Sequence, residues 1–142
     1  VDIDKKIEKM ENQKISQIFE LKGEAYFREL EFNVTIQYLS HHNKIISLGG
    51  GAFINKEIRK MIKYKSSTFW LNWNTDTLIN RIKNNNKRPV VKDMNLSDIK
   101  KLIIERNKIY NLSDFKINCE NLKKGEIVNK ILQKCKKNEI TC

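Results

Sequence analysis

The chain has 142 residues, about the length of one domain, and 39% of them are hydrophobic. Its longest apolar runs have the length of a strand or a short helix, which excludes a membrane-spanning helix of about 20 residues. The net charge of +11 is compatible with nucleic-acid binding, but the lysines are scattered and do not alternate with aromatic residues, so small anionic ligands are the simpler prediction.

Helical and strand patterns alternate along the chain, without a fixed repeat and without a linker rich in glycine, serine or proline. The strand candidates are short apolar runs, and the helix candidates repeat apolar residues at three- and four-residue spacing. In chain order, the patterns predict the end of a strand at residues 1–3, helices at 15–21 and 24–39, a buried strand at 44–48, a helix at 55–63, a strand at 68–71, helices at 76–83 and 96–110, a strand at 115–117 and a helix at 125–133.

This alternation predicts an α/β fold with a parallel sheet flanked by helices, because strands joined by helices form right-handed crossovers. Ligands of such sheets bind beyond the carboxyl ends of the strands. Asp2 and Asp4 follow the first strand candidate, and Gly49-Gly50-Gly51 follows the second. The polar stretch 84–95, which contains the only proline, is predicted to be an exposed loop. We therefore predict one domain over residues 1–142, with its ligand site at these strand ends.

The two aspartates and the glycines each have a functional and a purely structural interpretation. Paired carboxylates at the end of a strand can hold the water shell of a metal ion, orient a hydroxyl group or accept its proton. An aspartate in that place is about as often only the N-cap of the next helix. Glycines directly after a buried strand can offer backbone N–H groups to a ligand, or can simply form a tight turn.

The arginines are ambiguous by themselves. Arg28 lies three residues before Glu31, and a solvated ion pair is the ordinary interpretation of that spacing. Arg106 lies near the end of a predicted helix, where any cation is favourable. Arg88 belongs to the basic loop and could cover a phosphate group, or could be one more polar loop residue.

The cysteines indicate the compartment. They lie far apart and include no C-x-x-C pair, which argues against a disulfide framework or a zinc site. Free thiols are typical of a reducing cytoplasm, so a cytoplasmic protein is predicted. The three residues are Cys119, Cys135 and Cys142.

Taken together and in order, these residues resemble the shikimate kinase family. The resemblance covers nearly the whole chain and depends most on the Gly-Glu-x-x-Phe-Arg-x-x-Glu pattern at residues 23–31 and the three glycines at 49–51. The other matching residues are Asp2 and Asp4, the run at 15–19, Arg88-Pro89, and Arg106 followed by Tyr110.

The resemblance implies an ATP-dependent transfer of a phosphoryl group to the 3-hydroxyl of shikimate, by a monomer that does not bind nucleic acid or membranes. Arg28 and Arg106 would bind the carboxylate of shikimate, a task that suits the planar guanidinium group. Asp4 would bind the ring hydroxyls and accept the proton of the attacking one. The further implied substrate contacts are the backbone of Gly50 and Gly51, the rings of Phe19 and Phe27, and Glu31, which would steady Arg28.

The resemblance also implies which residues contact ATP and Mg²⁺. Asp2 would hold a water of the Mg²⁺ shell, and Arg81 would flank the adenine. Arg88, on a lid loop at 84–95, would close over the phosphoryl group that is transferred.

The chain departs from the family in one large respect. The resemblance implies a three-layer fold of the P-loop NTPase type, but the 142 residues contain no G-x-x-x-x-G-K-[ST] motif. We expect a strand, a phosphate-binding loop and a helix, on the order of thirty residues, to precede Val1. The first, central strand and this loop would then be absent from residues 1–142, which alone are expected to be inactive. Two alternatives stay open, a shikimate-binding relic without kinase activity and a related kinase for another small molecule.

Overall fold

The structure, a computed structural model, describes residues 1–41, 43–83, 89–91 and 94–140. The chain forms two compact units, Val1–Ser66 and Ser67–Cys142. The prediction of one domain over residues 1–142 stays a prediction. No helix among the described residues is long and apolar enough to cross a membrane.

The first unit is built from helices around one short stretch of parallel pairing. Asp2 and Ser47 form an isolated parallel bridge, in which Ile3 N donates to Ser47 O at 3.1 Å and Ser47 N donates to Val1 O at 2.7 Å. The Asp2 side chain then caps the first helix by accepting the N–H of Lys5. The elements of this unit are α1 (Ile3–Glu11), α2 (Ile15–Leu39), the short 3₁₀ helix η1 (Ala52–Ile54) and α3 (Lys56–Lys65).

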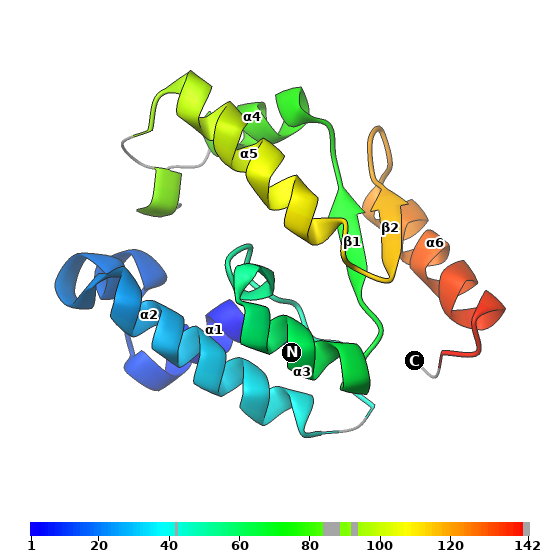
Figure 1. Cartoon of the computed structure of the whole chain (residues 1–142), viewed down its shortest axis with the longest axis horizontal. Coiled ribbons are helices and arrows are strands. Elements are labelled where there is room, and N and C mark those ends of the chain that lie inside the picture. The colour runs from blue at the N-terminus through cyan, green and yellow to red at the C-terminus, as the bar shows by residue number, and fades with distance from the viewer. Residues whose placement is uncertain (42, 84–88, 92–93, 141–142) are drawn as a thin grey trace. The chain divides into compact units, whose positions relative to one another are not determined.

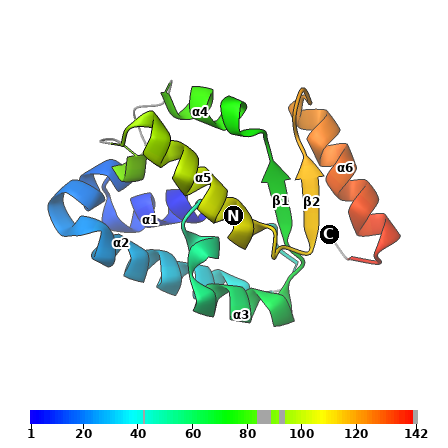
Figure 2. The same cartoon turned by 45° about the horizontal axis from the view of Figure 1, so that its top comes forward.

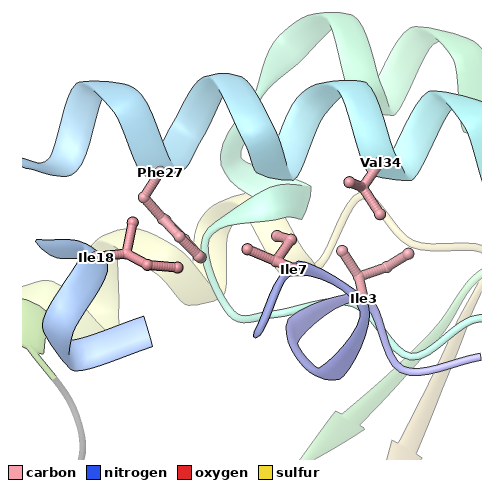
Figure 3. Close-up of a cluster of buried hydrophobic side chains, with 5 residues drawn as sticks. All are labelled: Ile3, Ile7, Ile18, Phe27 and Val34. Carbon is pink, nitrogen blue, oxygen red and sulfur yellow. The ribbon is translucent and has the colours of Figure 1, made fainter. Parts of the chain in front are cut away.

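An apolar cluster between α1 and α2 holds this unit together (Figure 3). Ile3 and Ile7 lie one turn apart on α1 and are fully buried. They pack against Ile18, Phe27 and Val34 of α2. Each such side chain contributes about 2 kcal/mol on burial, so this cluster fixes the helix that carries Asp4 against the helix that carries Arg28.

The predicted buried strand over residues 44–48 is wrong. Among the described residues, the backbone of this run bonds to another segment through the Ser47 bridge and through Ile45 O, which accepts from the amino group of Val1, and Ile45 is 81% exposed. A strand is stabilised by its hydrogen-bonded neighbours, and the pairing stops here because α1 begins at Ile3. With pairing limited to this short stretch, the apolar run does not form a strand.

Helix α2 joins the two helices that were predicted over 15–21 and 24–39. They meet at Gly23, whose φ of 81° and ψ of 169° interrupt the helical geometry. This region of the backbone is accessible almost only to glycine. The kink allows the second half of α2 to begin afresh at Glu24.

Replacing Gly23 by alanine is expected to lower the free energy of unfolding by about 1–3 kcal/mol. No atom lies within 4 Å of the position of the added Cβ, so the cost comes from the backbone alone. Gly125 is the matched control, since its surroundings are equally open and its φ is not in the left-handed range. Gly125→Ala should be neutral or slightly stabilising, and equal losses for both variants in urea denaturation would contradict the backbone explanation.

The second unit contains a parallel pair of strands with helices beside it (Figures 1 and 2). The strands pair in register from Phe69↔Phe115 to Asn72↔Asn118, which confirms the predicted strands at 68–71 and 115–117. The elements are β1 (Phe69–Asn72), α4 (Thr75–Lys83), the short 3₁₀ helix η2 (Pro89–Val91), α5 (Leu96–Tyr110), β2 (Phe115–Asn118) and α6 (Lys124–Lys137).

Two carboxylates fix the register of this strand pair. Asp114 accepts hydrogen bonds from the backbone N and the hydroxyl of Thr68, at 2.8 and 2.6 Å. At the other end, Glu120 accepts from Asn74 N at 3.1 Å and from the Thr77 hydroxyl at 2.7 Å. These bonds tie each end of one strand to the segment that flanks the other.

Candidate functional site

Arg28 lies on the second half of α2, between two glutamates on the same face of the helix. Its Nη1 donates to Glu31 Oε2 at 2.7 Å, and its Nε and Nη2 donate to Glu24 Oε1 at 3.1 and 3.0 Å. Residues three and four positions apart are neighbours on a helix. The Glu31 side chain is only 3% exposed. Burial disfavours the charge on Arg28, but its bonds to Glu31 and Glu24 outweigh this effect and raise the pKa of its guanidinium.

Aromatic rings surround the same guanidinium group. Its central carbon lies 5.2 Å from the centre of the Phe27 ring and 5.9 Å from that of Phe19. The two rings contact each other with their centres 4.8 Å apart. These contacts add cation–π attraction and limit how far the guanidinium group can tilt.

Asp4 carries an acceptor that no described residue uses. It is the second residue of α1, and its Oδ1 is buried without a hydrogen-bond partner among the described residues. Burial, followed by the charges of Asp2 and Glu8, raises the pKa of Asp4 against the opposing effect of Arg28. An unsatisfied buried carboxylate oxygen is costly. This oxygen is therefore suited to accept a hydroxyl hydrogen, and the raised pKa makes it a better proton acceptor.

The backbone of the glycine turn lies directly against Asp4, Glu31 and Arg28, and no side chain on Gly49 or Gly51 would fit there. A Cβ on Gly49 would lie 2.7 Å from Asp4 Oδ1 and 3.0 Å from Glu31 Oε1. A Cβ on Gly51 would overlap Nη1 of Arg28 and lie 2.8 Å from its Nη2. Only glycine allows the backbone to approach this closely. The carboxylate of Asp4 and the guanidinium of Arg28 thus both lie against one short turn.

The first unit therefore collects most of the predicted substrate residues at one place. Gly50 lies within the same turn. Two residues of this site were not among the predicted site residues. Gly49 could have been found from the glycine triplet, and Glu24 from its position four residues before Arg28. The predicted substrate residues that the first unit brings together are Asp4, Phe19, Phe27, Arg28, Glu31, Gly50 and Gly51.

Apart from Asp2, the remaining predicted site residues belong to the second unit. The guanidinium carbon of Arg81 lies 4.4 Å from the centre of the Trp73 ring, a contact that the sequence did not predict. Arg106 lies on α5, and its joint action with Arg28 stays a prediction. Arg88 lies outside the described residues, and of the predicted lid at 84–95 the structure describes the short helix η2, Met94 and Asn95.

Asp2 was predicted to hold a metal ion through water. Its Oδ1 accepts the N–H of Lys5 at 3.1 Å, so it also serves as an N-cap. The described part of the chain contains no group of three or more histidine, cysteine, aspartate or glutamate side chains that could hold a metal ion. The contact of Asp2 with a metal ion through water stays a prediction.

The family model for shikimate kinase matches residues 1–136. The chain belongs to the shikimate kinase family. It is 39% identical to the shikimate kinase of Persephonella marina, over 93% of this chain and 80% of that protein. With the shikimate kinase of Sulfurihydrogenibium sp. it shares 38% identity, over 96% of this chain and 82% of that protein.

Solved shikimate kinases have the same fold. The crystal structure of shikimate kinase from Aquifex aeolicus is 37% identical and gives a TM-score of 0.86, over 98% of this chain and 82% of that one. A shikimate kinase from Acinetobacter baumannii, at 24% identity, gives 0.89 over 99% of this chain and 79% of that one. These matches confirm the α/β fold with a parallel sheet flanked by helices, and the membership in a family of phosphotransferases with an alcohol acceptor.

Proposed function

We propose that this chain supplies the shikimate site of an ATP-dependent shikimate 3-kinase. The observation that carries the proposal is the free buried oxygen of Asp4 beside the glycine turn that also packs against Arg28. The substrate that fits this arrangement carries a carboxylate at one end and a hydroxyl at the other. Shikimate has both groups on one ring.

Binding begins with the carboxylate. Arg28 presents a guanidinium group that two glutamates and two aromatic rings hold in place. A positioned guanidinium binds a carboxylate through two parallel N–H···O bonds. Phe19, which is partly buried, would offer an apolar surface to the carbon ring of the substrate, with the buried ring of Phe27 packed behind it. Because this group is ordered before the substrate arrives, binding costs little additional side-chain entropy.

Asp4 then acts on the 3-hydroxyl group. Its Oδ1 accepts the hydroxyl hydrogen bond and then the proton, while the hydroxyl oxygen forms a bond to the γ-phosphorus of ATP. The bond between that phosphorus and the oxygen bridging to the β-phosphate breaks, and ADP leaves with the electron pair. The proton on Asp4 passes to water after the products leave.

Other residues would contact ATP and Mg²⁺ in this proposal. Arg81 would flank the adenine, with Trp73 behind its guanidinium group, and Arg88 would contact the transferred phosphoryl group. Arg106 would add a second cation for the substrate carboxylate. Asp2 would hold Mg²⁺ through a water molecule, and the ion would neutralise charge on the ATP phosphates.

The proposal describes a cytoplasmic enzyme that acts as a monomer. The test is ATP-dependent phosphorylation of shikimate by the natural gene product that contains residues 1–142, because these residues include no G-x-x-x-x-G-K-[ST] motif. We expect shikimate 3-phosphate and ADP in equal amounts. Shikimate methyl ester, which lacks the negative charge, should be a much poorer acceptor.

Other outcomes would replace the proposal. Shikimate binding by calorimetry without any turnover would favour the relic that binds shikimate but does not phosphorylate it. Turnover of gluconate or a nucleoside in preference to shikimate would favour a related small-molecule kinase.

A further inference from the structure

The hydrogen bonds of Arg28 leave a defined part of its guanidinium group for a ligand. A guanidinium group has five N–H donors. Glu24 takes the Nε hydrogen and one Nη2 hydrogen, and Glu31 takes one Nη1 hydrogen. One hydrogen on each terminal nitrogen is then used by none of the described residues. That number matches the two oxygens of a carboxylate.

The contact with Glu24 decides which hydrogen of Nη2 stays available. A single oxygen of Glu24, Oε1, accepts from both Nε and Nη2. Only the two adjacent hydrogens along the side of the guanidinium group can reach one oxygen together. The other Nη2 hydrogen must therefore point along the end of the group, away from Glu24.

Glu31 alone would leave the guanidinium group free to rotate. Its bond with Arg28 is to Nη1, and with that bond alone, rotation about the Cγ–Cδ and Cδ–Nε bonds of Arg28 can still change the direction of the Nη2 hydrogens. Phe19, Phe27 and Gly51 limit tilting out of the plane, but rotation within the plane needs a second fixed edge. Glu24 provides that edge.

We propose that Glu24 is a positioning residue, which fixes the side edge of Arg28 so that both terminal nitrogens present one N–H to the substrate carboxylate. This inference rests on the proposed shikimate site. The Glu24 side chain is 57% exposed, so its ion pair contributes little to stability. Its role is to orient Arg28, and its loss should appear in substrate binding.

Steady-state kinetics of three variants of the natural gene product test this role, after shikimate turnover by the wild type has been measured. Glu24→Ala should raise KM for shikimate about tenfold, with kcat and the KM for ATP within about twofold of the wild type. Glu24→Gln keeps the one oxygen that both bonds use, and its KM should lie within about threefold of the wild type. Glu29→Ala, an exposed glutamate on the same helix, should leave KM unchanged.

Shikimate methyl ester provides a readout that altered folding would not change. Because the ester carries no charge, Glu24→Ala should affect its KM far less than that of shikimate, and the preference for the acid should fall. An unchanged KM for shikimate in Glu24→Ala, an equal rise in Glu29→Ala, or a loss confined to kcat would each overturn the inference. A wild type that turns over no shikimate would overturn the proposed function together with this inference, whereas the other outcomes affect the inference alone.

Discussion

Asp4→Asn is expected to lower kcat for shikimate phosphorylation by about 100- to 1000-fold, with a smaller change in KM. Asparagine has nearly the same shape and can still accept a hydrogen bond through its amide oxygen. It cannot take the proton that the attacking hydroxyl must lose. Measurement of kcat at saturating shikimate and ATP therefore isolates the proton transfer.

Asp4→Asn should lose activity without losing stability. Burial disfavours the charge on Asp4, and Asp2 and Glu8 add repulsion, so a neutral side chain should leave the free energy of unfolding equal or higher. Glu8→Gln is the control, since it removes the same charge one turn further along α1; its kcat should stay within about twofold of the wild type. More than a tenth of the wild-type kcat in Asp4→Asn would exclude Asp4 as the proton acceptor.

Arg28→Ala should raise KM for shikimate by at least about 100-fold, because a charge-assisted pair of hydrogen bonds to the substrate is lost. It should also lower the free energy of unfolding by about 3 kcal/mol, since the buried Glu31 loses its 2.7 Å ion pair with Arg28. Steady-state kinetics and urea denaturation measure the two effects separately.

Two further variants separate binding from stability. Arg28→Lys keeps a positive charge near Glu31 but lacks the planar fork, so it should recover part of the stability and little of the binding. The double variant Arg28→Ala, Glu31→Gln removes both charges and should regain stability with KM still high. A KM for Arg28→Ala within about threefold of the wild type would show that Arg28 does not bind the carboxylate.

The sequence predicted the start of a helix reliably where an N-cap residue marks it. Asn95 was expected to cap the helix that ends near Tyr110, and its side chain accepts the N–H of Asp98 at 2.9 Å. The helix predicted to begin at Asn55 starts in the same way, with Asn55 accepting from Glu57 N and Ile58 N. Such caps involve residues two or three positions apart, so the amino-acid order alone specifies them.

Predictions that depended on distant partners were less successful. The apolar run at 44–48 has the composition of a buried strand, yet among the described residues it pairs only through the bridge at Ser47 and the bond from Val1 to Ile45 O, because a strand requires another segment in register. One boundary was missed for a local reason instead: the closing helix was predicted over 125–133 but extends to Lys137. Lysines in its last turn interact favourably with the helix dipole, a small effect that apolar spacing does not report.

The sequence by itself determined the family of this protein, the positions of most helices and the identity of Asp4, Arg28 and the glycine turn. These features depend on residue types at fixed short spacings, which remain readable without coordinates. Only the tertiary structure showed that Asp4 Oδ1 has no partner among the described residues, and that Glu24 occupies the side edge of Arg28. The burial of Asp4 arises when α1, α2 and the glycine turn pack together, because desolvation depends on atoms far apart in the chain. The contact between Glu24 and Arg28 lies within α2, but spacing alone does not specify which of their atoms bond.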